Sequence, residues 1–278
     1  MNVRNATVDF IFYPGKAEEL ADTVHRHLKE AENSGDSAPV ILSPHAGYGY
    51  AGNFMGAAYK AASAADFSRV VILSRVHREP DKVLFLPEST AFRTPLGDVE
   101  VDSPWISSLL QADPHFKQDD IPHTEEHSIE VQLPFIQVLW PQAKIVPILS
   151  GVPSLSLMRI LGGALRQLVR SSSGRTLFVV SSNLSAYDHP EDAKRDTDHF
   201  LSLLEKGEWE SFPDLLRQKK INACSADCLT AVYVLFNGHL KPELLGKECD
   251  FDGIGEYAKK PFEKRVCFGA LAFKQTVQ

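Results

Sequence analysis

The sequence predicts an α/β fold in which residues 1–278 form one domain with a central, mostly parallel sheet flanked by helices. Two observations support this fold class: short apolar runs recur along the chain, and helical patterns lie between them. The runs are residues 39–42, 70–73, 145–149 and 177–180. Their length and β-branched content are typical of strands that are buried on both faces of a parallel sheet. Strand–helix alternation over most of the chain favours crossover connections.

The segments between these runs supply the helices that the crossovers need. Helices are expected over residues 53–64, 128–139, 154–169 and 227–236. The first is rich in alanine, and Ser154 and Asp227 are residues that favour the starts of the last two. Pro134 must either kink the second helix or mark a later start, because proline disrupts a helix interior.

The composition is that of an ordinary globular protein, with 44% hydrophobic and 23% charged residues. Because no apolar run approaches the roughly 20 residues that cross a bilayer, we expect no membrane partner. The opening MNVRNATVDF lacks the layout of a secretory signal, which predicts a cytoplasmic protein. The net charge is −7 and the basic residues are scattered, so we expect no nucleic-acid partner.

The four cysteines, Cys224, Cys228, Cys249 and Cys267, all fall in the last quarter of the chain. Their spacing matches neither a C-x-x-C motif nor a dense disulfide framework. In a reducing compartment we expect all four to be thiols. Cys267, within RVCFGALAF, is expected to act as a small buried apolar residue.

Three polar segments follow three of the predicted strands directly. They are SPHAGYGYAG after residues 39–42, SRVHRE after residues 70–73 and SSNLSAYDH after residues 177–180. The carboxyl ends of parallel strands meet at one edge of a sheet, where α/β proteins bind their ligands. The first two segments bring His45 and His77 to that edge. The sequence therefore predicts a binding site there, built from residues that are far apart along the chain.

Taken alone, each candidate residue is weaker evidence for a binding site. His45 lies among small residues that let a bound group approach, but an ordinary loop histidine would fit as well. His77, between two arginines, is more typical of a surface residue. Cys224 precedes a predicted helix whose positive end would favour a thiolate, whereas a buried structural thiol is the plainer alternative.

A rival motif lies at HTEEHSIE, residues 123–130. Read as H-x-x-E-H, it matches an inverted zinc-protease pattern with His123 and His127 as ligands and Glu126 as the base. The reading requires both histidines on one helical face and offers no clear third ligand. Five-residue motifs also arise often by chance, which makes the protease the weaker hypothesis.

Seven segments together resemble the Memo family, whose bacterial members are called AmmeMemoRadiSam system protein B. They occur in the expected order and span nearly the whole chain. The segments are FYPGKAEEL, SPHAGYGYAG, RTPLGDVEVD, EEHSIEVQLPF, SSNLS, ACSADC and RVCFGALAF. Membership would imply a scaffold like that of class III extradiol dioxygenases of the protocatechuate 4,5-dioxygenase type. It would also suggest a functional link to radical SAM and AMMECR-type proteins.

The resemblance implies a ligand set for one metal ion. The related dioxygenases hold non-haem Fe(II) with two histidines and a glutamate, and Memo-like proteins have a cysteine in place of the carboxylate. Carried over to this chain, the ligands are His45, His77 and Cys224. Fe(II) is the metal that the resemblance favours, and Cu or Zn would also suit two imidazoles and a thiolate. The pocket residues that it implies are Tyr48, Glu126, His127 and Ser182.

The chain departs from the family pattern where the dioxygenase relatives have their acid and base. Asn183 stands where the family usually has aspartate, and Ala186 where it has histidine. Alanine cannot transfer a proton, so Ala186 is excluded from a catalytic role. Asn183 and the nearby His189 are the remaining candidates. Two hypotheses follow: a metal-dependent oxidoreductase acting on a small molecule, or a non-catalytic protein that binds a metal or a peptide.

Overall fold

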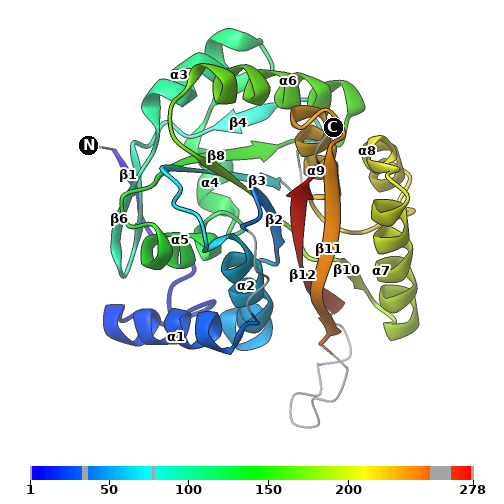
Figure 1. Cartoon of the computed structure of the whole chain (residues 1–278), viewed down its shortest axis with the longest axis horizontal. Coiled ribbons are helices and arrows are strands. Elements are labelled where there is room, and N and C mark those ends of the chain that lie inside the picture. Colours follow the sequence, from blue (N-terminus) through cyan, green and yellow to red (C-terminus); the bar gives the residue numbers. More distant parts are fainter. Residues whose placement is uncertain (1, 33–36, 77–78, 251–263, 277–278) are drawn as a thin grey trace.

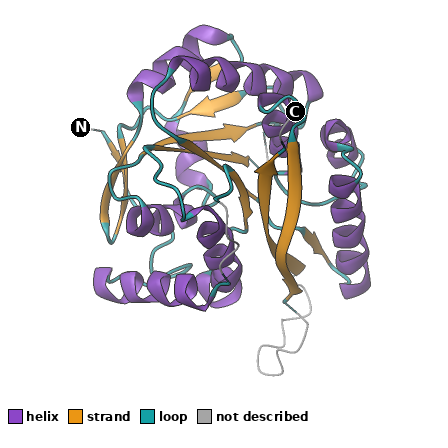
Figure 2. Ribbon diagram, in the orientation of Figure 1, coloured by secondary structure: helices purple, strands orange, loops and turns teal. Residues whose placement is uncertain are grey.

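A nine-stranded sheet forms the centre of the computed structural model, which describes residues 2–32, 37–76, 79–250 and 264–276 (Figures 1 and 2). Its middle consists of parallel strands that contain the four predicted apolar runs, except that the first strand begins at Val40 rather than at residue 39. In spatial order these are β2 (Val40–Ser43), β9 (Thr176–Ser181), β3 (Arg69–Arg75) and β8 (Lys144–Ser150). Their side chains are almost entirely buried, as expected for strands covered on both faces.

The flanks of this sheet add antiparallel pairs. Beside β2 lies β12 (Arg265–Gln275), which also pairs with β10 (Ser185–Tyr187) and with β11 (Leu240–Cys249). At the other side β4 (Leu84–Leu86) runs antiparallel to β8 and carries β7 (Phe116–Gln118) as a parallel neighbour. The α/β prediction is confirmed. The sheet is mixed, however, because only its middle is parallel throughout.

A second, three-stranded sheet is formed near the N-terminus. It consists of β1 (Val3–Arg4), β5 (Ala91–Thr94) and β6 (Gly97–Glu100). β1 pairs parallel to β5, and β5 pairs antiparallel to β6. This sheet fixes the position of the first residues of the chain, which matter for the site described below.

Helices cover the central sheet. One group consists of α1 (Ala17–Glu30), α2 (Tyr48–Ala62) and α5 (Leu133–Leu139), which pack against one another and, through α2, against β2 and β12. The others are α3 (Ser103–Ala112), α4 (Asp120–Glu125), α6 (Leu155–Ser171), α7 (Pro190–Glu205), α8 (Phe212–Arg217) and α9 (Ala226–Leu235). Figure 1 shows α1, α2 and α5 together at the lower left, away from α6 and α9.

All four predicted helices exist, with boundaries that local chemistry explains. The hydroxyl of Ser154 caps α6 by accepting a hydrogen bond from the Leu157 amide at 3.5 Å. α5 begins at Leu133, after a short 3-10 helix (Glu130–Gln132), so Pro134 lies in the first turn, where proline is tolerated. α2 begins at Tyr48, earlier than expected.

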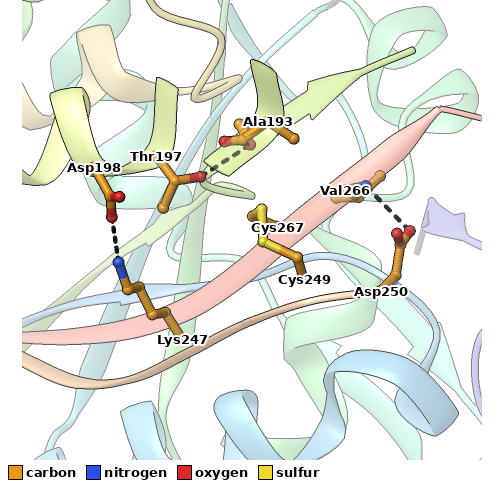
Figure 3. Close-up of a disulfide and its surroundings, with 9 residues drawn as sticks. Ala193, Thr197, Asp198, Lys247, Cys249, Asp250, Val266 and Cys267 are labelled. Atoms are coloured by element: carbon orange, nitrogen blue, oxygen red, sulfur yellow. Dashed lines mark hydrogen bonds and ion pairs between the residues drawn. A yellow bond between two sulfur atoms is a disulfide. The ribbon is translucent and has the colours of Figure 1, made fainter. Parts of the chain in front are cut away.

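The expectation that all cysteines are thiols is wrong for two of them. Cys249 and Cys267 form a disulfide between β11 and β12 (Figure 3). The antiparallel register places the two residues directly opposite each other, which the sequence spacing did not reveal. Cys267 is buried, as expected, and Cys224 and Cys228 are free cysteines.

Among the residues that the structure describes, no helix combines the length and the apolar character needed to cross a lipid bilayer.

Candidate metal centre

The carboxyl ends of the four parallel strands carry a layer of buried serines. Ser43, Ser150 and Ser181 end β2, β8 and β9, and Ser74 is the penultimate residue of β3. Each is at most 1% exposed. Buried hydroxyls need hydrogen-bond partners, and three of these four bond to a neighbouring strand, to helix α9 or to the loop before α5. The layer gives the predicted site a polar floor.

His45 lies in the turn between β2 and α2 and is only 3% exposed. Its Nδ1 is 3.1 Å from the Ser181 hydroxyl oxygen. That hydroxyl donates its proton to the Ser128 carbonyl at 2.7 Å and accepts a hydrogen bond from the Gln132 amide at 3.0 Å. Because the hydroxyl proton is already used, Nδ1 of His45 must be the donor in this contact. Its Nε2 therefore carries a lone pair, the form in which imidazole binds a metal.

That lone pair faces the thiol of Cys224. The Nε2 atom of His45 lies 3.3 Å from Sγ of Cys224, although 179 positions separate the two residues in the chain. The backbone N–H of Asn183 donates to the same sulfur at 3.2 Å, and Ser182 Oγ lies 3.5 Å away. The Asn183 N–H favours sulfur as the thiolate, its metal-binding form, whereas the Ser182 hydroxyl donates its own proton to the Asn183 carbonyl at 2.8 Å.

The third predicted ligand, His77, lies outside the described residues, and so does its neighbour Arg78. Within the described ranges no group of three His, Cys, Asp or Glu side chains could hold a metal ion. Two of the three predicted ligands are therefore brought together, and the part of His77 stays a prediction. β3 nevertheless runs to Arg75, so this strand ends two positions before His77, beside the strand that carries Ser181.

The predicted pocket residues surround His45 to different degrees. The ring of His127 packs between Phe12, at 4.5 Å between centroids, and His45, at 5.5 Å. Ser182 contacts Cys224 as described above. Tyr48 is different, because its hydroxyl donates to the Val131 carbonyl at 2.8 Å in the interior, and burial raises its pKa well above the usual value. Tyr48 thus supports the site from the protein interior.

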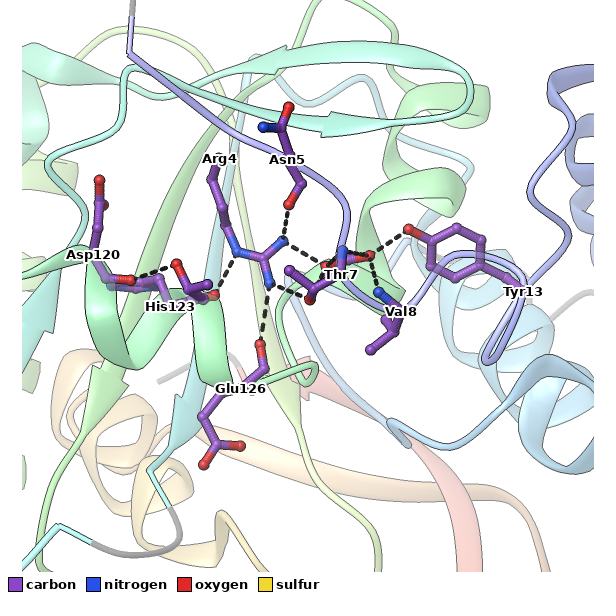
Figure 4. Close-up of polar contacts among 10 residues, drawn as sticks. Arg4, Asn5, Thr7, Val8, Tyr13, Asp120, His123 and Glu126 are labelled. Atoms are coloured by element: carbon purple, nitrogen blue, oxygen red, sulfur yellow. Dashed lines mark hydrogen bonds and ion pairs between the residues drawn. The ribbon is translucent and has the colours of Figure 1, made fainter.

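Glu126 directly follows α4 as its C-terminal cap residue, and its backbone carbonyl accepts a hydrogen bond from Arg4 at 3.4 Å. Figure 4 shows its side chain directed away from that guanidinium. Glu126 is half-buried, next to His127 in the chain. Its backbone therefore joins the segment that carries His127 to the N-terminal residues.

The two candidate catalytic residues lie in different surroundings. Asn183 lies within the site: its side-chain oxygen accepts a hydrogen bond from the His45 amide at 3.2 Å, in addition to the N–H that it donates to sulfur. These contacts give Asn183 a positioning role. His189 is exposed and precedes α7 as its N-terminal cap residue. Ala186 lies in β10, opposite Val266.

The zinc-protease reading of residues 123–130 is wrong. α4 ends at Glu125, so His123 and His127 do not share a helical face. His123 is 1% exposed, with Nε2 3.3 Å from the Phe85 carbonyl, and burial lowers its pKa to about 4. It is a neutral core histidine.

The burial of His123 makes stability depend on pH. Its pKa is about 4 in the folded chain against 6.5 for the unperturbed group, so the unfolded chain takes up the proton first as the pH falls. The free energy of unfolding therefore keeps its full value above the pKa that His123 has in the unfolded chain. It decreases as the pH falls towards the pKa that His123 has in the folded chain. Between pH 7.5 and pH 5 we expect a loss of about 2 kcal/mol. Urea unfolding should show this loss for the wild type relative to His123→Gln, and equal losses in both would contradict it.

A buried ion pair that the sequence analysis missed attaches the N-terminal segment to the site. Arg4 lies 2.5 Å from the Glu130 carboxylate, and both side chains are almost fully buried. Glu130 also accepts hydrogen bonds from the amides of Thr7 and Val8, at 3.0 and 3.1 Å, and from the Tyr13 hydroxyl at 2.6 Å. Figure 4 shows Arg4, Thr7, Val8 and Tyr13 gathered around these contacts.

In this cluster the negative charge of Glu130 is balanced by the positive charge of Arg4. Burial alone would raise the pKa of Glu130, but Arg4 and the Tyr13 hydroxyl hold it below the usual value. Glu130 is therefore ionised at neutral pH. The cluster fixes the segment from Arg4 to Tyr13, and within this segment the ring of Phe12 packs against His127. EHSIE thus serves two purposes: His127 lies in the site, and Glu130 fixes the wall beside it.

Comparison with known proteins adds the family. The profile described as "Memo-like protein" matches residues 4–244. The chain belongs to the Memo-like protein family. A "MEMO1 family protein" of Nitrosopumilus maritimus is 28% identical over 98% of this chain and 99% of its own length. Another from Aeropyrum pernix is 30% identical over 93% of this chain and 96% of its own length.

One solved structure, "uncharacterized protein JW3007" from Escherichia coli K12, overlaps with a TM-score of 0.49 and 11% identity, over 84% of this chain and 98% of that chain. A likeness this low carries no argument about fold or function.

In this Memo-like chain, Ser181 should control metal affinity through His45. Replacing Ser181 with alanine removes the acceptor of the Nδ1 proton and leaves the imidazole tautomer free. Loss of such an orienting contact typically weakens metal binding roughly 10- to 100-fold. Metal titration of Ser181→Ala should show this weakening. Ser43→Ala is a matched control, because Ser43 pairs with Ser181 in register and its hydroxyl has no hydrogen-bond partner among the described residues. Equal affinities in the two variants would contradict the assignment.

Proposed function

We propose that this Memo-like chain binds one metal ion through His45, His77 and Cys224 and uses it to oxidise a small molecule. The observation that carries the proposal is the 3.3 Å contact between His45 Nε2 and Cys224 Sγ. Fe(II) is the first candidate, and Cu and Zn are the alternatives that two imidazoles and a thiolate also accept. Three protein ligands leave coordination positions for water or substrate, as in catalytic metal sites.

The described donors fit a metal ion of this kind. His45 presents the lone pair of Nε2 because Ser181 accepts the Nδ1 proton. Cys224 receives an N–H from Asn183, which favours the thiolate. A fixed imidazole tautomer and a stabilised thiolate are what a metal requires of its protein ligands. A bound ion would supply Lewis acidity and, if it were iron or copper, redox chemistry.

The chain's own residues would then bind and orient the substrate. Phe12 and His127 form a half-buried aromatic wall beside His45. The His127 ring is nearly perpendicular to that of His45, at 87°, so the two rings meet edge to face. The buried serines beneath exclude water from the lower side of the site. Since Asn183 and Ala186 cannot act as acid or base, His127, whose ring contacts that of His45, is the candidate for proton transfer among the described residues.

Metal loading without air tests the proposal. Wild-type protein loaded with Fe(II) should retain about one ion per chain after desalting. His45→Ala should retain none, and His115→Ala should match the wild type, because His115 pairs with Asp113 in the loop before β7. Oxygen uptake with catechols and related compounds then tests oxidation. Unchanged metal uptake by His45→Ala would falsify the ligand assignment.

A second candidate function is a non-catalytic protein that keeps the pocket for a metal or peptide. It is favoured by Asn183, whose side chain accepts from the His45 backbone, and by Ala186, which has no proton to transfer. The variant Asn183→Asp with Ala186→His restores the residues usual in the family. Activity that appears only in this variant supports the second candidate, and turnover by the wild-type chain rules it out.

The cytoplasmic location and the link to radical SAM and AMMECR-type proteins remain predictions. Both could be tested in cells by fractionation and by co-purification with the tagged wild-type chain.

A further inference from the structure

Two adjoining cavities form a groove at the sheet edge opposite the metal centre. Their volumes are about 690 and 540 Å³. Both are lined by Val169 at the end of α6, Phe178 of β9, Phe236 after α9 and Gln275 of β12. Thr176 and Phe178 of β9 line the groove, whereas the site at His45 lies at the other end of the strand, at Ser181. Three of the four shared residues are apolar and make the middle of the groove largely apolar, with the Phe178 and Phe236 rings packed edge to face at 6.0 Å.

Both ends of the groove are cationic. One end is lined by Arg166 and Arg170 and the other by Arg175 and Lys274. No aspartate or glutamate lines either cavity among the described residues. This composition contrasts with the net charge of −7 for the whole chain. A positive groove on an acidic protein creates a local potential that attracts anionic groups.

Two of these cations are available to a partner. Arg170 and Arg175 are exposed, and neither forms an ion pair with a described residue. The others are engaged at least in part: Lys274 pairs with Glu243 at 2.8 Å, and Arg166 donates to the Val234 carbonyl. Arginine forms bidentate contacts with carboxylates, so Arg170 and Arg175 suit a pair of acidic side chains.

We propose that this groove binds an acidic peptide segment of a partner protein, with an apolar side chain placed between two acidic ones. The apolar residue would cover Phe236 and Val169, and the acidic residues would reach Arg170 at one end and Arg175 at the other. Charge at the two ends with an apolar middle matches an extended chain better than a single small anion. The proposal is independent of metal chemistry, because the groove shares no residue with the site at the other edge.

Fluorescence anisotropy with a labelled peptide tests the proposal on the full chain. The probe is Glu-Asp-Leu-Phe-Asp-Glu, and the neutral counterpart is Gln-Asn-Leu-Phe-Asn-Gln. The acidic peptide should bind, with an affinity that falls as salt is added, and the neutral one should bind roughly tenfold more weakly or not at all. Arg170→Glu with Arg175→Glu should weaken the acidic peptide roughly tenfold or more.

The control for the double variant is Lys29→Glu with Lys117→Glu, which changes the net charge equally at exposed positions outside the groove. This control should bind like the wild type. Circular dichroism should show the same fold for both variants, since all four side chains are exposed. Equal binding by the two double variants overturns the proposal. Displacement of the peptide by inorganic pyrophosphate at equal concentration also overturns it, because the groove would then be a general anion site.

Discussion

Replacing Cys224 with alanine is expected to abolish high-affinity metal binding. The variant removes the only described sulfur within reach of His45 Nε2, from which it lies 3.3 Å away. Loss of a thiolate ligand should cost more than the roughly 10- to 100-fold that loss of an orienting contact typically costs. Titration with Co(II) as a spectroscopic probe should show a thiolate-to-metal absorption band in the wild type and none in Cys224→Ala.

Cys228→Ala is the matched control for that experiment. Cys228 belongs to the same segment and is a free but fully buried thiol, 3.7 Å from the Ser74 carbonyl and 3.9 Å from Ser150 Oγ. Burial raises its pKa well above the usual value, so it stays a thiol at neutral pH. Its removal should leave the absorption band in place. A band that survives in Cys224→Ala but vanishes in Cys228→Ala would identify Cys228 as the metal ligand. That result would refute the centre described here.

Replacing Glu130 with alanine is expected to lower the free energy of unfolding by about 3–5 kcal/mol. The variant leaves the guanidinium of Arg4 buried without its carboxylate and removes the acceptor for Tyr13. It should also release the segment that carries Phe12 and so loosen the cover of His127. Urea unfolding measures the first effect, and the metal dissociation rate measures the second.

Glu210→Ala is the control, because Glu210 forms an ion pair with Arg159 in which both side chains are about half exposed. Removal of an exposed pair costs at most about 1 kcal/mol. The two variants should therefore differ by several-fold in destabilisation. If Glu130→Ala proves as stable as Glu210→Ala, the N-terminal segment does not depend on the buried pair.

The sequence was sufficient for the parts of the fold that repeat a simple pattern. The four apolar runs became the parallel strands β2, β9, β3 and β8, since their short length and β-branched content suit strands buried on both faces. Ser154 capped α6 as expected, and Pro134 fixed a later start for α5. The site followed from topology, because loops after parallel strands meet at one edge. That reasoning brought His45 to the strand ends; Cys224 came from the family resemblance.

The features that were missed depend on pairing between distant segments. The disulfide needs the register of β11 on β12, which no local pattern encodes. The Arg4–Glu130 pair spans 126 positions, and neither residue stands out in the sequence. α1 was different, because its buried residues Leu20, Val24 and Leu28 follow helical spacing and could have been recognised.

The place of β12 has a consequence for how the chain folds. β12 follows every other strand in the sequence, yet it lies between β2 and β10 and so closes the sheet beside His45. Until it emerges from the ribosome, one edge of β2 has no partner and exposes its backbone amides and carbonyls. Such late, long-range closure slows folding and prolongs exposure to aggregation. Synthesis thus leaves a period in which this edge of β2 is open to pairing with another chain.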